Sequence, residues 1–472
     1  MREEKDSIGK INVPEDAFYG ISTLRALDSF PITNERVNLG LIKAFLTVKK
    51  AAAGANRKIG KLDADKHKFI IQAVDLLIGE TEQAAGKESF SIYEKVIIDP
   101  YHGGAAFPLN ANINEIIANT ALRIMGKKLG SYENIHPVND INMSQSENGV
   151  YLTALKIASV LLMREMTESF SVLKKALEEK RKEFDGVVKL GRDRLQDANA
   201  ITLGQEFESW AGMIDRDIKQ LLNGGNSFEI IYPGSAAADN LSPAEEEYTR
   251  AYYEELKRIT ELPLERFADT SKVNQNLDEF LSVHGLIRSG ASSIIKICND
   301  LRLLASGPYG GLGEISLPPV YEDNGLIQEN NNPAVLENTL QAAELVKGHD
   351  AVISNLVSAG NLETNAFLPL IAHLFLKSIE MLRDSVINLT VKCIQGIEAN
   401  VERCRQNLLG SNAVAASLIN IFGFDKITKI LKESEEKGIS VVDLLKQKKI
   451  LSEKELVGLI SREMGINSER RT

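Results

Sequence analysis

The sequence predicts a mainly α-helical fold of the long-bundle type. The strongest evidence is residues 151–184, where apolar side chains recur at helical spacing and no glycine or proline interrupts them. A pattern of this length is typical of a helical bundle or a coiled-coil-like helix. Aromatic residues make up only 6% of the chain, which favours a core of Leu, Ile, Val and Ala between helices over a β-sandwich.

Further apolar-rich stretches predict the remaining long helices, and strand signals are weak and short. The helical stretches cover residues 37–59, 63–86, 274–305, 332–359 and 365–401. The best strand candidates are residues 95–98 and 229–232. Polar breaks rich in Gly, Pro and Asn cover residues 101–114, 133–149, 223–243 and 307–333. Long loops in a compact helical protein are often functional.

These patterns predict three domains. An N-terminal, mainly helical domain would cover residues 1–145, and a central long-helix bundle would cover residues 146–397. A small C-terminal helical domain would cover residues 398–472. In this last segment Ser452 and Glu455 have the spacing of a capping box at a helix start.

Composition excludes several function classes. The chain has 472 residues and a formal net charge of −10, and its Lys/Arg runs alternate with Glu, so we expect no nucleic-acid partner. No apolar stretch reaches the length of a membrane span, and residues 1–10 lack the apolar core of a signal peptide. Three widely spaced cysteines indicate free thiols in a reducing cytoplasm. The six histidines are scattered, so we expect no metal and no cofactor.

Several segments resemble motifs of the aspartase/fumarase superfamily. Residues 16–26 (DAFYGISTLRA) are similar to D-A-x-Y-G-x-x-T-L-R-A, in the version closer to aspartase than to fumarase. Residues 110–119 (NANINEIIAN) are similar to N-x-N-x-N-E-x-x-A-N. Residues 136–146 (HPVNDINMSQS) resemble H-P-N-D-x-V-N-x-S-Q-S, and residues 191–198 (GRDRLQDA) resemble G-R-T-H-L-Q-D-A. Residues 306–318 resemble the run before the signature loop, so the matches span nearly the whole chain in family order.

The resemblance implies a homotetramer whose active sites combine loops of three subunits, with three domains per subunit. Members of the superfamily carry out reversible anti elimination across a C–N or C–O bond, usually releasing fumarate. A base removes the Cβ proton, and positioned donors stabilise the resulting carbanion as an aci-carboxylate. The expected ligand is therefore a small molecule, a carboxylate or an amino acid.

The family signature, G-S-S-x-M-P-x-K-x-N-P, is altered in this chain. Residues 323–333 read DNGLIQENNNP and align with it without a gap. Asn324 then stands at the position of the family's base Ser, and an amide cannot accept a proton at neutral pH. Asn330 replaces the Lys that grips a substrate carboxylate, whereas Asn332 is retained.

The other substrate-facing motifs are altered at similar positions. Phe107-Pro108 stands where the family has Thr-Ser, and Asp193-Arg194 where it has Thr-His. Glu147 interrupts the Ser-Ser/Thr-Asn motif. The residues expected to bind substrate are Ser146, Asn148, Arg194, Asn330, Asn332 and Asn112. Glu337 matches the family Glu that pairs with the missing His, so we expect it to support Arg194 through an ion pair.

The catalytic residues are therefore unknown from the sequence. The candidates for a replacement base are Glu147, Asp193 and His102, with Glu322 and Glu329 as further nearby carboxylates. Two hypotheses remain open. The chain is an aspartate ammonia-lyase-like protein acting on or binding a substrate other than plain L-aspartate or L-malate, or it is a non-catalytic homologue serving as a scaffold or binding subunit.

Overall fold

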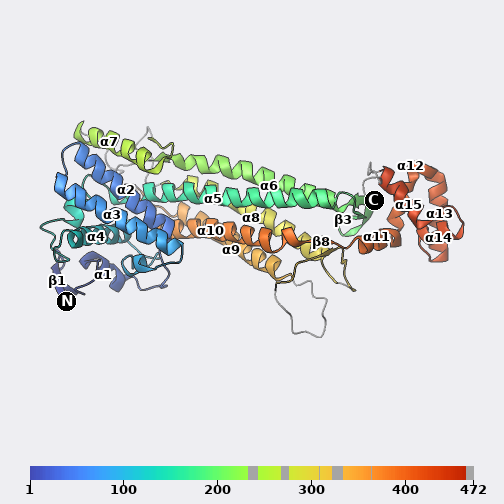
Figure 1. Ribbon diagram of the computed structural model, residues 1–472, viewed down its shortest axis with the longest axis horizontal. Coiled ribbons are helices and arrows are strands. Elements are labelled where there is room, and N and C mark those ends of the chain that lie inside the picture. Colours follow the sequence, from blue (N-terminus) through green and yellow to red (C-terminus); the bar gives the residue numbers. More distant parts are fainter. Residues whose placement is uncertain (232–242, 267–275, 308, 321–332, 363, 464–472) are drawn as a thin grey trace. The chain divides into compact units, whose positions relative to one another are not determined.

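The computed structural model describes the chain except for residues 232–242, 267–275, 308, 321–332, 363 and 464–472. Helices dominate the described residues, as the sequence predicts (Figure 1). The helices are α1 (Ile21–Ser29), α2 (Leu39–Lys58), α3 (Ala64–Ala85), α4 (Phe107–Ile124), α5 (Glu147–Glu183), α6 (Leu203–Asn226), α7 (Pro243–Thr260), α8 (Asp278–Leu304), α9 (Ala334–Ser358), α10 (Leu368–Lys392), α11 (Val401–Gly410), α12 (Ile419–Phe422), α13 (Phe424–Lys437), α14 (Val441–Gln447) and α15 (Glu453–Glu463).

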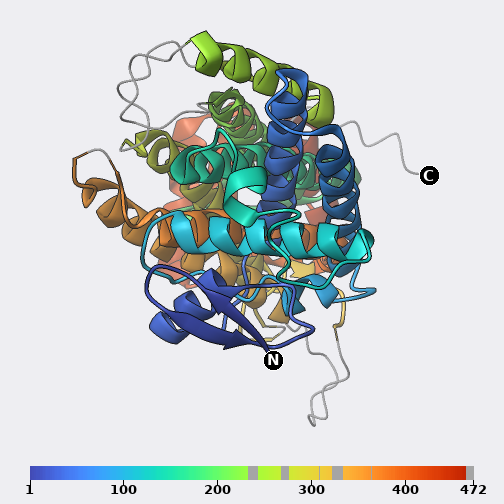
Figure 2. The ribbon, with the colours of Figure 1, turned by 90° about the vertical axis from the view of Figure 1, so that its left-hand side faces the viewer.

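The strands form small two-stranded sheets. Three pairs are antiparallel: β1 (Arg2–Lys5) with β2 (Lys10–Val13), β3 (Val188–Asp193) with β4 (Gln196–Thr202), and β7 (Ile315–Ser316) with β8 (Glu398–Ala399). The fourth, β5 (Ile230–Ile231) with β6 (Glu265–Arg266), is parallel. Figure 2 shows β1 and β2 paired beside the N terminus.

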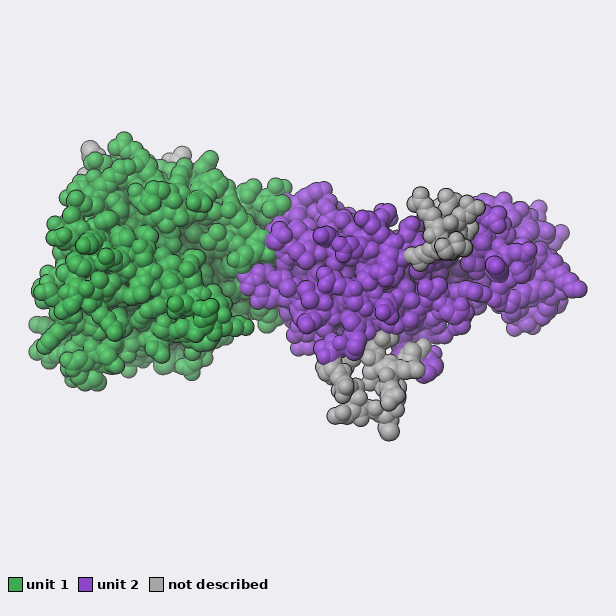
Figure 3. Space-filling model, in the orientation of Figure 1, with its two compact units in different colours: residues 1–166, 220–288, 345–381 green, residues 167–219, 289–344, 382–472 purple. Residues whose placement is uncertain are grey.

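The chain divides into two compact units, which Figure 3 colours separately. Unit 1 comprises Met1–Met166, Gln220–Arg288 and Leu345–Met381. Unit 2 comprises Thr167–Lys219, Ser289–Glu344 and Leu382–Thr472. The division into 1–145, 146–397 and 398–472 stays a prediction.

In unit 1, α2 packs against α3 and α7, and α4 packs against α3. In unit 2, the C-terminal helices enclose an apolar cluster that includes the fully buried Leu418, Val441 and Leu444. The predicted capping box starts α15. Glu455 N donates to Ser452 Oγ at 3.3 Å, and Ser452 N donates to Glu455 Oε2 at 2.8 Å.

Most predicted helices are confirmed, with corrections where local chemistry competes with the pattern. Residues 107–114 were expected in a polar break but form the start of α4, because Pro108 occupies its first turn and the asparagines that follow are buried. Residues 95–98 form no strand. The stretch 365–401 is not one helix, because α10 ends at Lys392 and β8 follows. None of the helices within the described ranges is both long and apolar enough to cross a membrane.

Candidate functional site

The Asp193-Arg194 pair lies at the tip of the β3–β4 hairpin in unit 2. Asp193 pairs with Gln196, so Arg194 and Leu195 form a two-residue loop, with φ of 51° and 63°. Positive φ at both positions favours Asn-Gly in such loops and strains larger residues. Strain of this kind often accompanies function. The hairpin therefore presents two charged side chains from a strained turn.

The two tip side chains are largely exposed. The side chain of Asp193 is 72% exposed and that of Arg194 is 89% exposed, with Arg194 Nε 3.4 Å from Asp193 Oδ2. Glu337 instead pairs with Arg302, whose Nη2 lies 3.4 Å from Glu337 Oε1. Within the described residues of this chain the two side chains thus have other partners, and the Arg194–Glu337 ion pair stays a prediction. The tight turn folds Arg194 back onto its neighbour, and Glu337 has a cation on α8 within reach.

A buried ionic network anchors the hairpin. Glu314 is 0% exposed and accepts hydrogen bonds from Arg192 at 2.8 and 3.0 Å and from Asn407 at 3.0 Å. Its second cation is Lys189, also 0% exposed, with Nζ 2.9 Å from Glu314 Oε2. Burial opposes ionisation of Glu314, but the hydrogen bond from Arg192 and the charge of Lys189 outweigh it and lower the pKa. The network joins β3, α11 and the segment just before β7.

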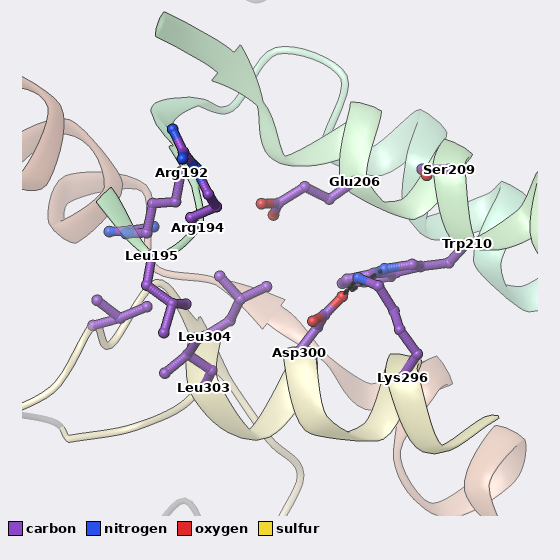
Figure 4. A pocket seen from close by; sticks show the side chains of 11 residues that line it. Arg192, Arg194, Leu195, Glu206, Ser209, Trp210, Lys296, Asp300, Leu303 and Leu304 are labelled. Atoms are coloured by element: carbon purple, nitrogen blue, oxygen red, sulfur yellow. Dashed lines mark hydrogen bonds and ion pairs between the residues drawn. The ribbon is translucent and has the colours of Figure 1, made fainter. Parts of the chain in front are cut away.

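A pocket of about 350 Å³ lies beside the hairpin tip within unit 2 (Figure 4). Trp210 forms part of its wall and donates from Nε1 to Asp300 Oδ2 at 3.1 Å. Lys296 also pairs with Asp300. The lining residues are Arg192, Arg194, Leu195, Glu206, Ser209, Trp210, Lys296, Asp300, Leu303, Leu304 and Leu312.

The Ser146–Asn148 segment lies in unit 1, where it begins the long helix α5. Ser146 Oγ accepts a hydrogen bond from Gly149 N at 3.0 Å, the geometry of an N-terminal cap. Glu147 is exposed in the first turn, where a negative charge is favoured by the helix dipole. Asn148 is half-buried. The segment thus has a structural role of its own beside the predicted contact with substrate.

A buried lysine that the sequence analysis missed lies in unit 1. Lys49 on α2 is 1% exposed, and its Nζ donates to Asn142 Oδ1 at 2.7 Å. Asn110 and Asn114 donate to the same oxygen at 3.2 and 3.3 Å. Burial lowers the pKa of Lys49 well below its ordinary value, and the charge of Glu147 opposes this shift. The sequence feature that indicates burial of Lys49 is its position in the apolar stripe of the predicted helix 37–59.

The remaining described candidates are buried. Asn112 is 0% exposed and donates from Nδ2 to Lys95 O at 3.1 Å. His102 is 7% exposed, with Nδ1 3.0 Å from Gly103 O, and burial lowers its pKa. A neutral, buried His102 is available for proton transfer only to a group that enters its loop. Asn324, Asn330, Asn332, Glu322 and Glu329 lie outside the described residues.

Among the described residues, no group of three or more His, Cys, Asp or Glu side chains could hold a metal ion. The three cysteines are buried, and burial raises the pKa of each thiol.

Comparison with known proteins gives consistent matches over the whole chain. A family model described as Lyase matches residues 9–348. The chain is 36% identical to an aspartate ammonia-lyase of Helicobacter pylori, over 97% of this chain and 96% of that protein. It is also 36% identical to an aspartate ammonia-lyase of Bacillus subtilis, over 96% of this chain and 94% of that protein.

Solved structures agree with this result. A fumarate lyase:delta crystallin from Brucella melitensis, bound to cobalt, has a TM-score of 0.89 and 35% identity, covering 99% of both chains. A class II fumarase from Schistosoma mansoni shares the fold, with a TM-score of 0.83 over 99% of this chain and 100% of that chain, at 23% identity. The protein therefore belongs to the lyase family, within the aspartase/fumarase superfamily.

Proposed function

We propose that this chain is an aspartate ammonia-lyase-like protein that acts on or binds a substrate other than plain L-aspartate or L-malate. The observation that carries the proposal is the charged, exposed Asp193–Arg194 pair at the hairpin tip. Family members have Thr-His there, and the signature base position is occupied by Asn324. A changed substrate explains why both positions differ while the hairpin keeps its buried anchor at Glu314.

Charge at the altered positions disfavours a dicarboxylate. Asp193 and Glu147 add negative charge where the family binds a substrate carboxylate. At ~4 Å and an effective dielectric constant of ~20, each like-charge contact costs about 4 kcal/mol. Arg194 is the one added cation and offsets one such contact. A substrate with one carboxylate, or with a cationic or neutral group in place of the second, fits this charge pattern better.

The proposed chemistry needs a new base. Glu147 and Asp193 are exposed carboxylates that substrate can reach, whereas His102 is buried. Lys49 is a further candidate, because a lysine with a lowered pKa is deprotonated more readily and can accept a proton. Substrate-binding roles for Ser146, Asn148, Arg194 and Asn112, and a supporting role for Glu337, belong to the same proposal.

Assembly into a homotetramer in the cytoplasm also belongs to this proposal. In the superfamily, loops of several subunits complete each active site. Exposed apolar side chains on long helices, such as Leu161, Val172, Val352 and Ile387, are consistent with burial against other subunits.

The experiment follows the ultraviolet absorbance of the fumarate double bond, with L-aspartate, L-malate and N-substituted aspartates as substrates. We expect turnover of plain L-aspartate and L-malate below about 1 s⁻¹, the low end of ordinary enzyme rates. We also expect at least one other ligand of the panel to be turned over or to raise the melting temperature. Faster turnover of L-aspartate would overturn the proposed change of substrate.

A different result of the same experiment would support the alternative hypothesis, a non-catalytic homologue. If no ligand is turned over and none stabilises the protein, the chain is a non-catalytic homologue that serves as a scaffold or binding subunit. If a ligand does stabilise the protein and the Arg194→Ala and Asn148→Ala variants keep that stabilisation, the family's substrate site is no longer used.

A further inference from the structure

The pocket beside the hairpin tip combines charged and apolar walls. Figure 4 shows Arg192, Arg194 and Glu206 on one side and Leu303 and Leu304 on the other. Its volume of about 350 Å³ lies within the usual range of small-molecule sites, ~300–1,000 Å³. Every lining residue belongs to unit 2, so one chain builds the whole pocket.

The lining as a whole has an excess of one positive charge. It holds the cations of Arg192, Arg194 and Lys296 and the carboxylates of Glu206 and Asp300. Arg192 is occupied by Glu314, and Lys296 is paired with Asp300. The Arg194 side chain is 89% exposed, and its partner among the described residues is its neighbour Asp193, whose Oδ2 lies 3.4 Å from Arg194 Nε. Arg194 is therefore the cation best placed to bind an incoming carboxylate.

The charged wall also holds an acceptor atom that other described residues leave unused. Glu206 Oε1 accepts a hydrogen bond from Lys189 Nζ at 2.7 Å. Glu206 Oε2 is buried and has no hydrogen-bond partner among the described residues. The Glu206 side chain as a whole is 24% exposed, so its carboxylate can attract an ammonium group of a ligand in the pocket. Figure 4 shows the Glu206 carboxylate directed into the pocket.

The apolar wall supplies the third feature. Leu195 is 71% exposed and Leu303 is 41% exposed, and Leu304 and Leu312 extend the same surface. An apolar group that covers these leucines would be removed from water at a gain of about 25 cal/mol for each Å² buried. A second carboxylate placed there would lose its hydration without gaining a donor.

We propose that this pocket binds an α-amino acid with an apolar side chain. Its carboxylate contacts Arg194, its ammonium group contacts the Glu206 carboxylate, and its side chain covers the leucines. The inference rests on the proposed function at Arg194, which that function also places at the substrate, whereas Glu206 and the leucines are residues of this pocket alone.

Trp210 makes the proposal directly testable, because it is the only tryptophan of the chain and it lines the pocket. Full-length protein is titrated with L-leucine while tryptophan fluorescence is recorded, with calorimetry as a second measure. We expect saturable binding of L-leucine. Its analogues 4-methylpentanoate, which lacks the amine, and 3-methylbutylamine, which lacks the carboxylate, should bind at least about tenfold more weakly, as should L-aspartate.

Variants locate the site. Arg194→Gln and Leu303→Ser should each weaken L-leucine binding about tenfold or more. The matched controls are Arg258→Gln, which removes another exposed arginine, and Leu76→Ser, which removes a leucine that is 51% exposed on α3. Neither control residue lines the pocket, so both control variants should bind L-leucine with the affinity of the parent protein. Glu206→Gln should abolish the preference for L-leucine over 4-methylpentanoate.

Several results would overturn the proposal. These are no saturable signal in fluorescence and calorimetry, equal binding of L-leucine and its deaminated analogue, or unchanged affinity in both Arg194→Gln and Leu303→Ser. If Glu206→Gln does not fold because Lys189 loses one of its two carboxylate partners, binding by Arg194→Gln and Leu303→Ser still decides whether the proposal holds. Lyase turnover is measured separately, so either proposal can fail while the other stands.

Discussion

At the scale of single residues, Glu314 shows how unit 2 depends on buried charge. Its carboxylate compensates Lys189 and Arg192, and Lys189 is fully buried. A paired buried charge contributes little net stability, but removing one partner leaves the other charges without compensation. The network therefore makes the hairpin position sensitive to one side chain.

We predict that Glu314→Gln lowers the free energy of unfolding by about 3–5 kcal/mol, because Lys189 and Arg192 keep their charges in a buried site. Urea unfolding measures the change. Glu3→Gln is the control, since Glu3 pairs with Lys10 on the surface and its side chain is 57% exposed. That variant should change stability by less than about 1 kcal/mol. Equal losses in the two variants would show that the buried network has no special role.

A buried histidine network in unit 1 gives a second residue-scale consequence. His284 lies between Asp350 Oδ1, 2.9 Å from Nδ1, and Ser378 Oγ, 3.0 Å from Nε2. His349 Nδ1 lies 2.9 Å from the same serine oxygen. Ser378 is 0% exposed and donates to Leu374 O, so this Asp–His–Ser arrangement is structural and cannot reach a substrate.

Acid should destabilise unit 1 through these histidines. Burial lowers the pKa of His349 from 6.5 to about 4, so the unfolded chain binds more protons than the folded chain between these values. The contribution of His349 to the free energy of unfolding is therefore fully present above about pH 6.5. It decreases by up to about 3 kcal/mol as the pH falls towards about 4. The other charged or titratable groups acting on it are His284, His373, Lys377 and Glu35.

Unfolding followed across this pH range checks the prediction. The His349→Gln variant should show a weaker pH dependence of the free energy of unfolding. The control His67→Gln, which removes a partly exposed histidine on α3, should keep most of that pH dependence. A parent protein whose stability does not change between these pH values would contradict the assigned burial of His349.

At the scale of elements, the β3–β4 hairpin combines a rigid anchor with a strained tip. Gly191 at its bulge is required, because a Cβ there would lie 2.4 Å from Asn199 O. At the tip, by contrast, the two positions with positive φ are not glycines: Arg194 and Leu195 occupy conformations that glycine would adopt without strain. The tip sequence is therefore better explained by the contacts its side chains make than by local stability.

We predict that Leu195→Gly raises the free energy of unfolding by about 0.5–1 kcal/mol, since relief of left-handed strain exceeds the entropic cost of glycine. The same variant should weaken L-leucine binding in the pocket that Leu195 lines. Lys449→Gly is the matched control: its φ is 55°, and it does not line the pocket. It should gain similar stability and keep ligand affinity. Stronger ligand binding by Leu195→Gly would contradict the functional explanation of the strain.

At the scale of the whole molecule, the proposed tetramer can be tested directly by measuring the mass of the protein in solution. Four chains of 52.0 kDa make about 208 kDa, which light scattering distinguishes from a monomer. Val172→Glu places a charge on an exposed apolar position of α5 and should lower the assembled mass. Leu76→Glu on α3 should not. A parent protein that scatters as a monomer would contradict the proposed assembly.

The local sequence determined much of the helical architecture and the residue types of the altered motifs. The predicted helix 151–184 corresponds to α5 (Glu147–Glu183), because apolar spacing requires only near neighbours, and the Ser452–Glu455 cap acts over one turn. Residues 107–114 were misassigned because burial of their asparagines in α4 overrides their loop-like composition. The change of Thr-His to Asp193-Arg194 is likewise visible in the sequence, but the positions of these two side chains at the hairpin tip are not.

Contacts between distant residues were decided only by the tertiary structure. Histidines that are scattered in the sequence meet around Ser378, and Lys49 and asparagines of α4 donate to the same oxygen of Asn142. Arg194 pairs with Asp193, and Glu337 pairs with Arg302. The pocket beside Trp210 combines residues from three separate stretches of the chain. Helical periodicity shows which face a residue occupies, whereas partners, burial and pKa depend on how those faces pack.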